Sequence, residues 1–285
     1  MDVVNFLLPP FVASLILTGI HAYLGLHVVE RGVIFVDLSL AQIAALGTTV
    51  GYMLGLGLHT PQNYWISLGF TFLGAALFAL VKARKVPIPQ EAIIGIAYAI
   101  AAAGSILLMN RIPEGTEHLR DMLIGNILTV SWAEVGQTAL LYAAIGWFHY
   151  LFRDRFLRIS IDPRGAEAAG LSIRWWDFLF YVSFGFVVTS SVAIAGVLLV
   201  FCYLVVPSVA AMLYAERVGP RLAIGWTMGA VVSALGVYLS YLLDLPTGAA
   251  IVVTFGLTLV VMASFRPLVQ ALRRPAPEPA LRIDA

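Results

Sequence analysis

Charged residues are scarce in this chain. They make up 12% of its 285 residues, whereas hydrophobic residues make up 60%. A typical soluble domain carries about 25% charged residues. The single cysteine, Cys202, excludes an intrachain disulfide. This composition excludes an ordinary water-soluble domain and predicts a membrane protein.

Several catalytic motifs are also missing. The sequence has no GxxxxGK[ST] phosphate loop, and its two lysines, Lys82 and Lys85, lie in one short connection. Neither HExxH nor GxSxG occurs. The net charge of +1 gives no support for nucleic-acid binding. We therefore expect no ATP hydrolysis by this chain, no catalytic residues and no tightly bound cofactor.

What the chain has instead is a series of long apolar runs, each able to cross a hydrocarbon core about 30 Å thick as a helix. We predict an all-α, polytopic membrane helix bundle. A shorter apolar stretch at 119–132 is interrupted by Gly125 and Asn126, which predicts a partial or re-entrant helix. The nine candidate spans are about 6–28, 33–56, 62–81, 91–109, 134–152, 175–192, 196–214, 221–243 and 248–265.

The positive charges indicate the orientation of these spans. When successive connections are assigned to alternate sides, 15 of the 17 lysines and arginines fall on one side, and Arg111 and Arg120 fall on the other. Cytoplasmic loops are enriched in positive charge. We therefore predict nine spans with the N-terminus outside and the C-terminus in the cytoplasm. Residues 1–268 form the transmembrane domain, and the proline-rich segment 269–285 is predicted to be a disordered cytoplasmic tail.

Three polar residues stand out within the first two spans. Asp37 lies about one turn inside the second span, and Gln42 and His21 lie deeper, at similar depth. Carboxylate, amide oxygen and imidazole are all ligands of divalent metals. Such residues also form hydrogen bonds between membrane helices. A metal pathway through Asp37, Gln42 and His21, with Asp37 and His21 as ligands, and a purely structural role both remain open.

One external segment contains a histidine among acidic residues. His118 lies in RIPEGTEHLRD, next to Glu117. Such a segment is compatible with contact to an external binding protein or with a metal entry site. A solvated loop is the alternative.

The longest cytoplasmic connection contains signals for a short helix. In IDPRGAEAAGLS, Asp162 is a suitable N-cap, Pro163 suits the first helical position, and Gly170 suits a left-handed C-terminal stop. These signals predict one short helix over about 162–171, outside the membrane.

Several segments together resemble the metal-import permease family of ATP-binding-cassette transporters, of the type called ABC-3. They occur in family order along the chain, as YLGLHVVERGVIFVDLSLAQIAALG, QEAIIGIAYA, LIGNILTVSWAEV, DPRGAEAAGLS, GVLLVFCYLVVPSVAAML and LSYLLDLPTGAAIVV.

The resemblance implies a permease subunit for zinc, manganese or iron in the bacterial inner membrane. It also implies cytoplasmic ATPase subunits, an external metal-binding protein and a second permease copy. The 162–171 helix would then couple the permease to the ATPase, and the positions matching the family pattern there are Asp162, Ala166, Ala169 and Gly170.

The second span departs from the family pattern. The family usually has an aspartate followed four residues later by a histidine, and those positions here are Leu38 and Gln42. Asp37 is adjacent to the acidic position but rotated by about 100° from it on a helix. Either the ligands have moved, with His21 or Asp37 compensating, or the substrate differs. An ATP-driven importer of a metal chelate and a secondary transporter working without ATP are the alternatives.

Overall fold

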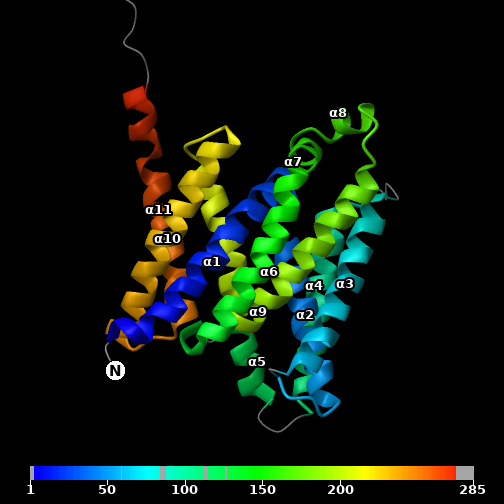
Figure 1. Cartoon of the computed structure of the whole chain (residues 1–285), viewed down its shortest axis with the longest axis vertical. Helices are drawn as coiled ribbons and strands as arrows, with labels where there is room; N and C mark the ends of the chain where they lie inside the picture. Colours follow the sequence, from blue (N-terminus) through cyan, green and yellow to red (C-terminus); the bar gives the residue numbers. More distant parts are fainter. Residues whose placement is uncertain (1–2, 59, 84–87, 112–114, 126, 274–285) are drawn as a thin grey trace, which may run out of the picture.

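The structure is a computed structural model that describes residues 3–58, 60–83, 88–111, 115–125 and 127–273. Those residues form helices and short connections, with no strand among them (Figure 1). The helices are α1 (Val3–Glu30), α2 (Val36–Met53), α3 (Pro61–Ala83), α4 (Gln90–Met109), α5 (Gly115–Ile124), α6 (Trp132–Leu151), α7 (Arg153–Ile161), α8 (Pro163–Ala168), α9 (Ile173–Met212), α10 (Val218–Leu243) and α11 (Thr247–Arg273), with a 3-10 turn at Ile127–Thr129.

The prediction of an all-α, multi-pass membrane bundle is confirmed. Six helices, α1, α3, α4, α9, α10 and α11, are long and apolar enough to cross a membrane. The helix α9 is 40 residues long and breaks at Gly196, which separates the predicted spans 175–192 and 196–214. The predicted ranges 33–56 and 134–152 correspond to α2 and α6, which are not among these six helices. The count of nine spans and their orientation stay predictions.

The helix α9 holds the bundle together. It packs against α1, α2, α3, α10 and α11. In Figure 1, α2, α3 and α4 lie on one side of α1 and α9, and α10 and α11 lie on the other. The core between them contains the fully buried Leu17, Phe180, Phe184 and Tyr203. The outer surface is also apolar, because Leu73 and Leu140 are 70% and 74% exposed. Such a surface suits lipid rather than water.

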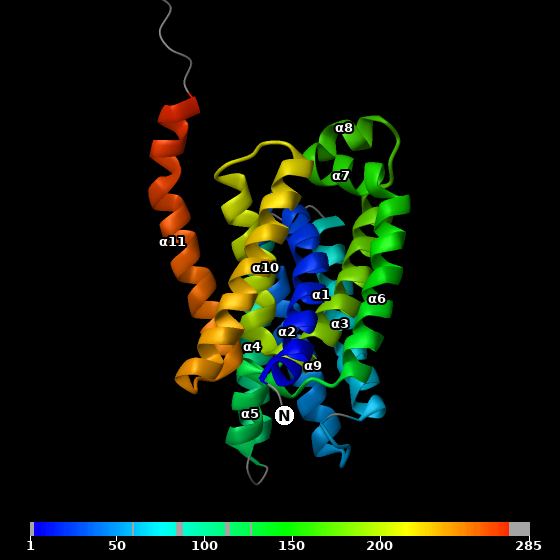
Figure 2. The ribbon, with the colours of Figure 1, turned by 60° about the vertical axis from the view of Figure 1, so that its left-hand side comes forward.

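The two ends of the bundle differ. Helix α5 and the N-terminus lie at one end, and α7, α8 and the C-terminal end of α11 lie at the opposite end (Figure 2). Helix α11 continues past residue 268 to Arg273. The rest of the predicted tail, residues 274–285, lies outside the described residues.

Three glycines bring distant backbone segments together near α5. The partial helix predicted at 119–132 is instead α5, which begins at Gly115 and ends at Ile124, and Gly125 has a φ of 70°. Gly196, at the break in α9, has a φ of 74°. A Cβ atom on either glycine would collide with the backbone of the other segment, and a Cβ on Gly248 would collide with the Ile124 carbonyl. We call Gly125, Gly196 and Gly248 the glycine junction; only glycine fits all three positions without displacing backbone.

Candidate functional site

Asp37 is a buried carboxylate without a partner. It lies in the first turn of α2 and is 0% exposed. Neither of its carboxylate oxygens accepts a hydrogen bond from any residue that the structure describes. A negative charge near a helix N-terminus is favoured by the helix dipole, but that effect is only about 0.3–1 kcal/mol at exposed sites. Asp37 therefore has both oxygens available for a cation.

His21 is held by neighbouring helices. Its Nδ1 donates to the Leu17 carbonyl at 2.7 Å, and its Nε2 lies 3.1 Å from Oγ of Ser191 on α9. The Ser191 hydroxyl also lies 2.6 Å from the hydroxyl of Tyr142 on α6. Both imidazole nitrogens are thus engaged. In this conformation His21 makes interhelical hydrogen bonds, and it would have to release Ser191 to bind a metal.

Gln42 is also buried, at 4% exposure. No hydrogen bond links Gln42, Asp37 and His21 to one another, and α1 and α2 each pack against α9. Within the described ranges, no group of three or more histidine, cysteine, aspartate or glutamate side chains is placed to hold a metal. A shared pathway through Asp37, Gln42 and His21 stays a prediction.

The short helix predicted at about 162–171 is present as α8. The Asp162 carboxylate accepts a hydrogen bond from the backbone N–H of Gly165 at 2.9 Å, and Pro163 occupies the first turn of α8. Ala166 is 0% exposed and anchors α8, whereas Ala169 is exposed. Gly170 adopts the predicted left-handed conformation, with a φ of 79°. The helix is shorter than 162–171, because its regular turns end at Ala168.

The predicted external contact lies on α5, at the opposite end of the bundle. Glu117 is exposed in the first turn of this helix. The side chain of His118 lies outside the described residues. The pairing of these two residues at an entry site stays a prediction.

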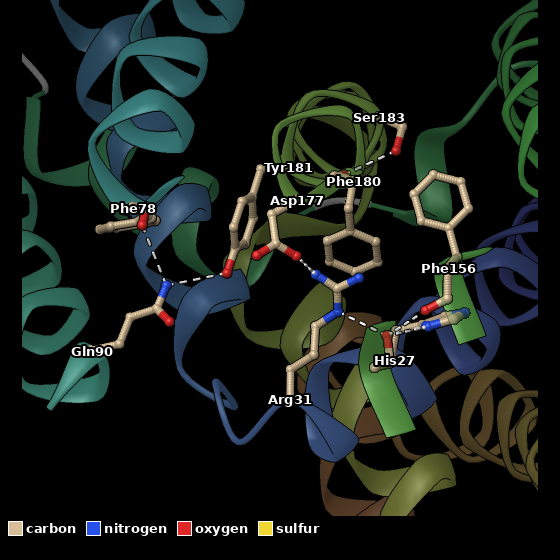
Figure 3. A network of polar contacts seen from close by, with 10 residues as sticks. His27, Arg31, Phe78, Gln90, Phe156, Asp177, Phe180, Tyr181 and Ser183 are labelled. Atoms are coloured by element: carbon tan, nitrogen blue, oxygen red, sulfur yellow. Dashed lines mark hydrogen bonds and ion pairs between the residues drawn. The ribbon is translucent and has the colours of Figure 1, made fainter. Parts of the chain in front are cut away.

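A buried polar cluster joins α1, α7 and α9, and the sequence did not reveal it (Figure 3). Arg31, which follows α1, donates from Nε to Ser160 Oγ at 2.9 Å and from Nη1 to Asp177 at 2.5 Å. The Arg31 and Asp177 side chains are 2% and 4% exposed. His27 Nδ1 lies 2.8 Å from the same Ser160 hydroxyl. We call Ser160, His27, Arg31 and Asp177 the α7 joint.

A signal for part of this cluster was present. Asp177 is an isolated acid in the apolar run WWDFLF, and a buried acid within a span needs a cationic partner. In the sequence, Arg31 contributes only to the charge pattern that predicts the orientation. Its side chain lies 4.0 Å from the centroid of the Phe180 ring, where a cation is stabilised by the aromatic face.

Comparison with known proteins decides the family. The model of the ABC 3 transport family matches residues 3–266. The chain belongs to this family. The resemblance noted in the sequence is therefore confirmed, and it covers the whole described bundle apart from the end of α11.

Known membrane proteins of metal transport systems align with most of the chain. Manganese transport system membrane protein MntC of Listeria monocytogenes is 26% identical over 263 residues, covering 92% of this chain and 91% of that protein. Chelated iron transport system membrane protein YfeC of Yersinia pestis is 26% identical and covers 87% of this chain and 82% of its own length.

A solved structure has the same fold. PsaBC from Streptococcus pneumoniae, in complex with Fab, superposes with a TM-score of 0.78 at 23% identity, covering 95% of this chain and 96% of that chain. This likeness establishes the arrangement of the helices.

Proposed function

We propose that this chain is the membrane-spanning permease subunit of an ATP-driven importer for a divalent transition metal. The observation that supports this most is the family match over residues 3–266, together with relatives named for manganese and chelated iron transport. The permease contributes the path and the gate. ATP is bound and hydrolysed by a separate partner chain.

The proposal includes the surroundings of the subunit. The chain lies in the bacterial inner membrane with its N-terminus outside and its C-terminus in the cytoplasm. An external metal-binding protein delivers the metal at the end with α5, where Glu117 and His118 lie. A second permease copy and two cytoplasmic ATPase subunits complete the transporter. The 162–171 segment, with Asp162, Ala166, Ala169 and Gly170, docks against the ATPase.

The proposed metal path passes Asp37. Its unpartnered buried oxygens support this role, since a buried carboxylate costs several kcal/mol unless it is paired or binds a metal. Gln42 adds a second oxygen donor from the same helix. Manganese accepts oxygen ligands more readily than zinc, which prefers imidazole and thiolate. We therefore propose manganese before zinc as the substrate, with His21 as a ligand only when its bond to Ser191 opens.

Reconstitution tests this function. The permease, with its ATPase, is placed in proteoliposomes, and accumulation of manganese, zinc and iron is followed with and without ATP. Gly165→Pro removes the N–H that Asp162 caps and should abolish ATP-dependent accumulation. Gly219→Pro is the matched control, because it lies in the first turn of α10, where proline is tolerated. Accumulation that needs no ATPase would instead indicate a secondary transporter.

An importer of a metal chelate is the second candidate, supported by the relative named for chelated iron. The same proteoliposomes distinguish a free-metal importer from a chelate importer. A free-metal importer accumulates manganese supplied as the aquo ion to its binding protein. A chelate importer accumulates metal and chelator together, in a constant ratio.

A further inference from the structure

The hydroxyl of Ser160, near the end of α7, uses all of its hydrogen-bonding positions. Its hydroxyl donates to the Phe156 carbonyl at 2.9 Å within α7 and accepts from Nε of Arg31 at 2.9 Å. A hydroxyl has one hydrogen and two lone pairs. The second lone pair therefore accepts from Nδ1–H of His27, at 2.8 Å. One side chain of α7 thus bonds two side chains at the end of α1, those of His27 and Arg31, which are labelled in Figure 3.

Arg31 extends this contact to α9. Its guanidinium bonds Ser160 through Nε and Asp177 through Nη1, and it lies over the ring of Phe180. The Arg31 and Asp177 side chains are almost completely excluded from solvent, at 2% and 4% exposure. Bonds of this kind are directional and are not easily replaced by water in a buried site. The α7 joint therefore fixes the relative positions of three helices.

The joint lies directly beside the segment proposed to meet the ATPase. Asp162 ends α7 and also caps α8, so a single residue separates the two helices. Helix α8 packs against α7 and α9, whereas α7 packs against α1. A displacement of α8 therefore reaches α1 through α7. Ser160, two residues before Asp162, provides the hydrogen bonds across that interface.

We propose that Ser160 is a positioning residue that transmits movement of the 162–171 helix to α1, acting through His27 and Arg31. This proposal rests on the proposed function and adds the route of coupling. Helix α1 also contains His21 and packs against α9 and α10, so its displacement changes the interhelical contacts along the centre of the bundle.

The test compares metal accumulated per ATP hydrolysed in proteoliposomes containing the whole transporter. Ser160→Ala keeps the helix but removes both acceptor positions. We expect the complex to assemble and to hydrolyse ATP, with metal uptake per ATP about tenfold lower, as expected when a hydrogen bond to a charged group is lost. Ser160→Thr retains a hydroxyl that can bond back to the preceding turn. This variant should keep metal uptake per ATP at the wild-type value.

Ser105→Ala is the matched control. Ser105 is a fully buried serine on α4 whose hydroxyl donates to the Ala101 carbonyl of its own helix. Its loss should leave uptake per ATP at the wild-type value. An equal decrease in Ser105→Ala would overturn the proposal, because it would show that loss of any buried hydroxyl uncouples transport. A wild-type ratio in Ser160→Ala would overturn it directly.

Arg31→Lys covers the case in which Ser160→Ala fails to assemble. Lysine keeps a cation for Asp177 but lacks the fork that bonds Ser160 at the same time. The ratio should fall as in Ser160→Ala, and an unchanged ratio in an assembled Arg31→Lys complex would overturn the proposal. Failure of the wild type to accumulate any metal with ATP would refute the proposed function instead.

Discussion

Replacing Asp37 by asparagine tests whether its carboxylate binds the metal or only has a structural role. The two side chains have nearly the same volume, so no cavity is created. The wild-type carboxylate is fully buried with two unpartnered oxygens. An unsatisfied buried polar group costs about 1–3 kcal/mol, and a charged one costs more. In the absence of metal, Asp37→Asn should therefore leave the free energy of unfolding unchanged or raise it by about 1–3 kcal/mol.

Metal should reverse this order of stability. A ligand at 100 times its dissociation constant stabilises the folded state by about 2.7 kcal/mol. If Asp37 binds the metal, wild type gains this increment and Asp37→Asn does not. The assay is thermal unfolding of the purified permease at one fixed scan rate, with and without manganese, beside uptake in proteoliposomes. We expect Asp37→Asn to be at least as stable as wild type without metal, to lack the metal-dependent increase, and to transport nothing.

Glu91→Gln is the matched control for Asp37→Asn. Glu91 lies in the first turn of α4 and has one buried, unpartnered carboxylate oxygen, Oε2. The substitution makes the same change from acid to amide at another helix N-terminus. It should leave both uptake and the metal-dependent stabilisation at wild-type values. Normal uptake by Asp37→Asn, or equal loss in Glu91→Gln, would refute the assignment of Asp37 to the metal path.

Three further sets of substitutions test other parts of the structure. Asp162→Ala removes the N-cap of α8, which destabilises the helix by about 1 kcal/mol, and it should lower metal uptake per ATP in proteoliposomes. Asp162→Asn keeps a capping oxygen and should keep the wild-type uptake per ATP in the same assay. Gly196→Ala should lower the thermal unfolding midpoint, because its φ is 74° and its backbone contacts Gly125, whereas Gly136→Ala, in open space on α6, should not. Glu30 and Arg221 form an ion pair between α1 and α10; reversing either charge alone should reduce uptake, and exchanging both should restore it.

The sequence predicted those parts of the fold that depend on local chemistry. The apolar runs predicted the long helices because a span must satisfy its own backbone hydrogen bonds in lipid. Asp162, Pro163 and Gly170 predicted α8 because a cap, a first-turn proline and a left-handed stop act within a few residues. Asp37 was selected because a carboxylate inside a span is expensive.

Contacts between residues far apart in the chain could not be predicted from the sequence. Arg31 and Asp177 are 146 positions apart, and Arg31 and Ser160 are 129 apart. Serine is common in membrane helices, so neither Ser160 nor Ser191 stood out. The prediction that His21 shares a site with Asp37 used depth alone. Its bond to Ser191 depends on how α1 is rotated against α9, which depth does not determine.

The glycine junction has a consequence for the order of assembly during synthesis. Gly125, Gly196 and Gly248 belong to three segments that leave the ribosome one after another, and the last of them begins the final helix, α11. Chains acquire structure from the N-terminus as they are made. The backbones of α5 and α9 can meet early, but the junction closes only when α11 has been inserted. A permease truncated before Gly248 would keep most of its spans yet leave this junction open, so an unfinished chain differs in structure from a finished one at this point.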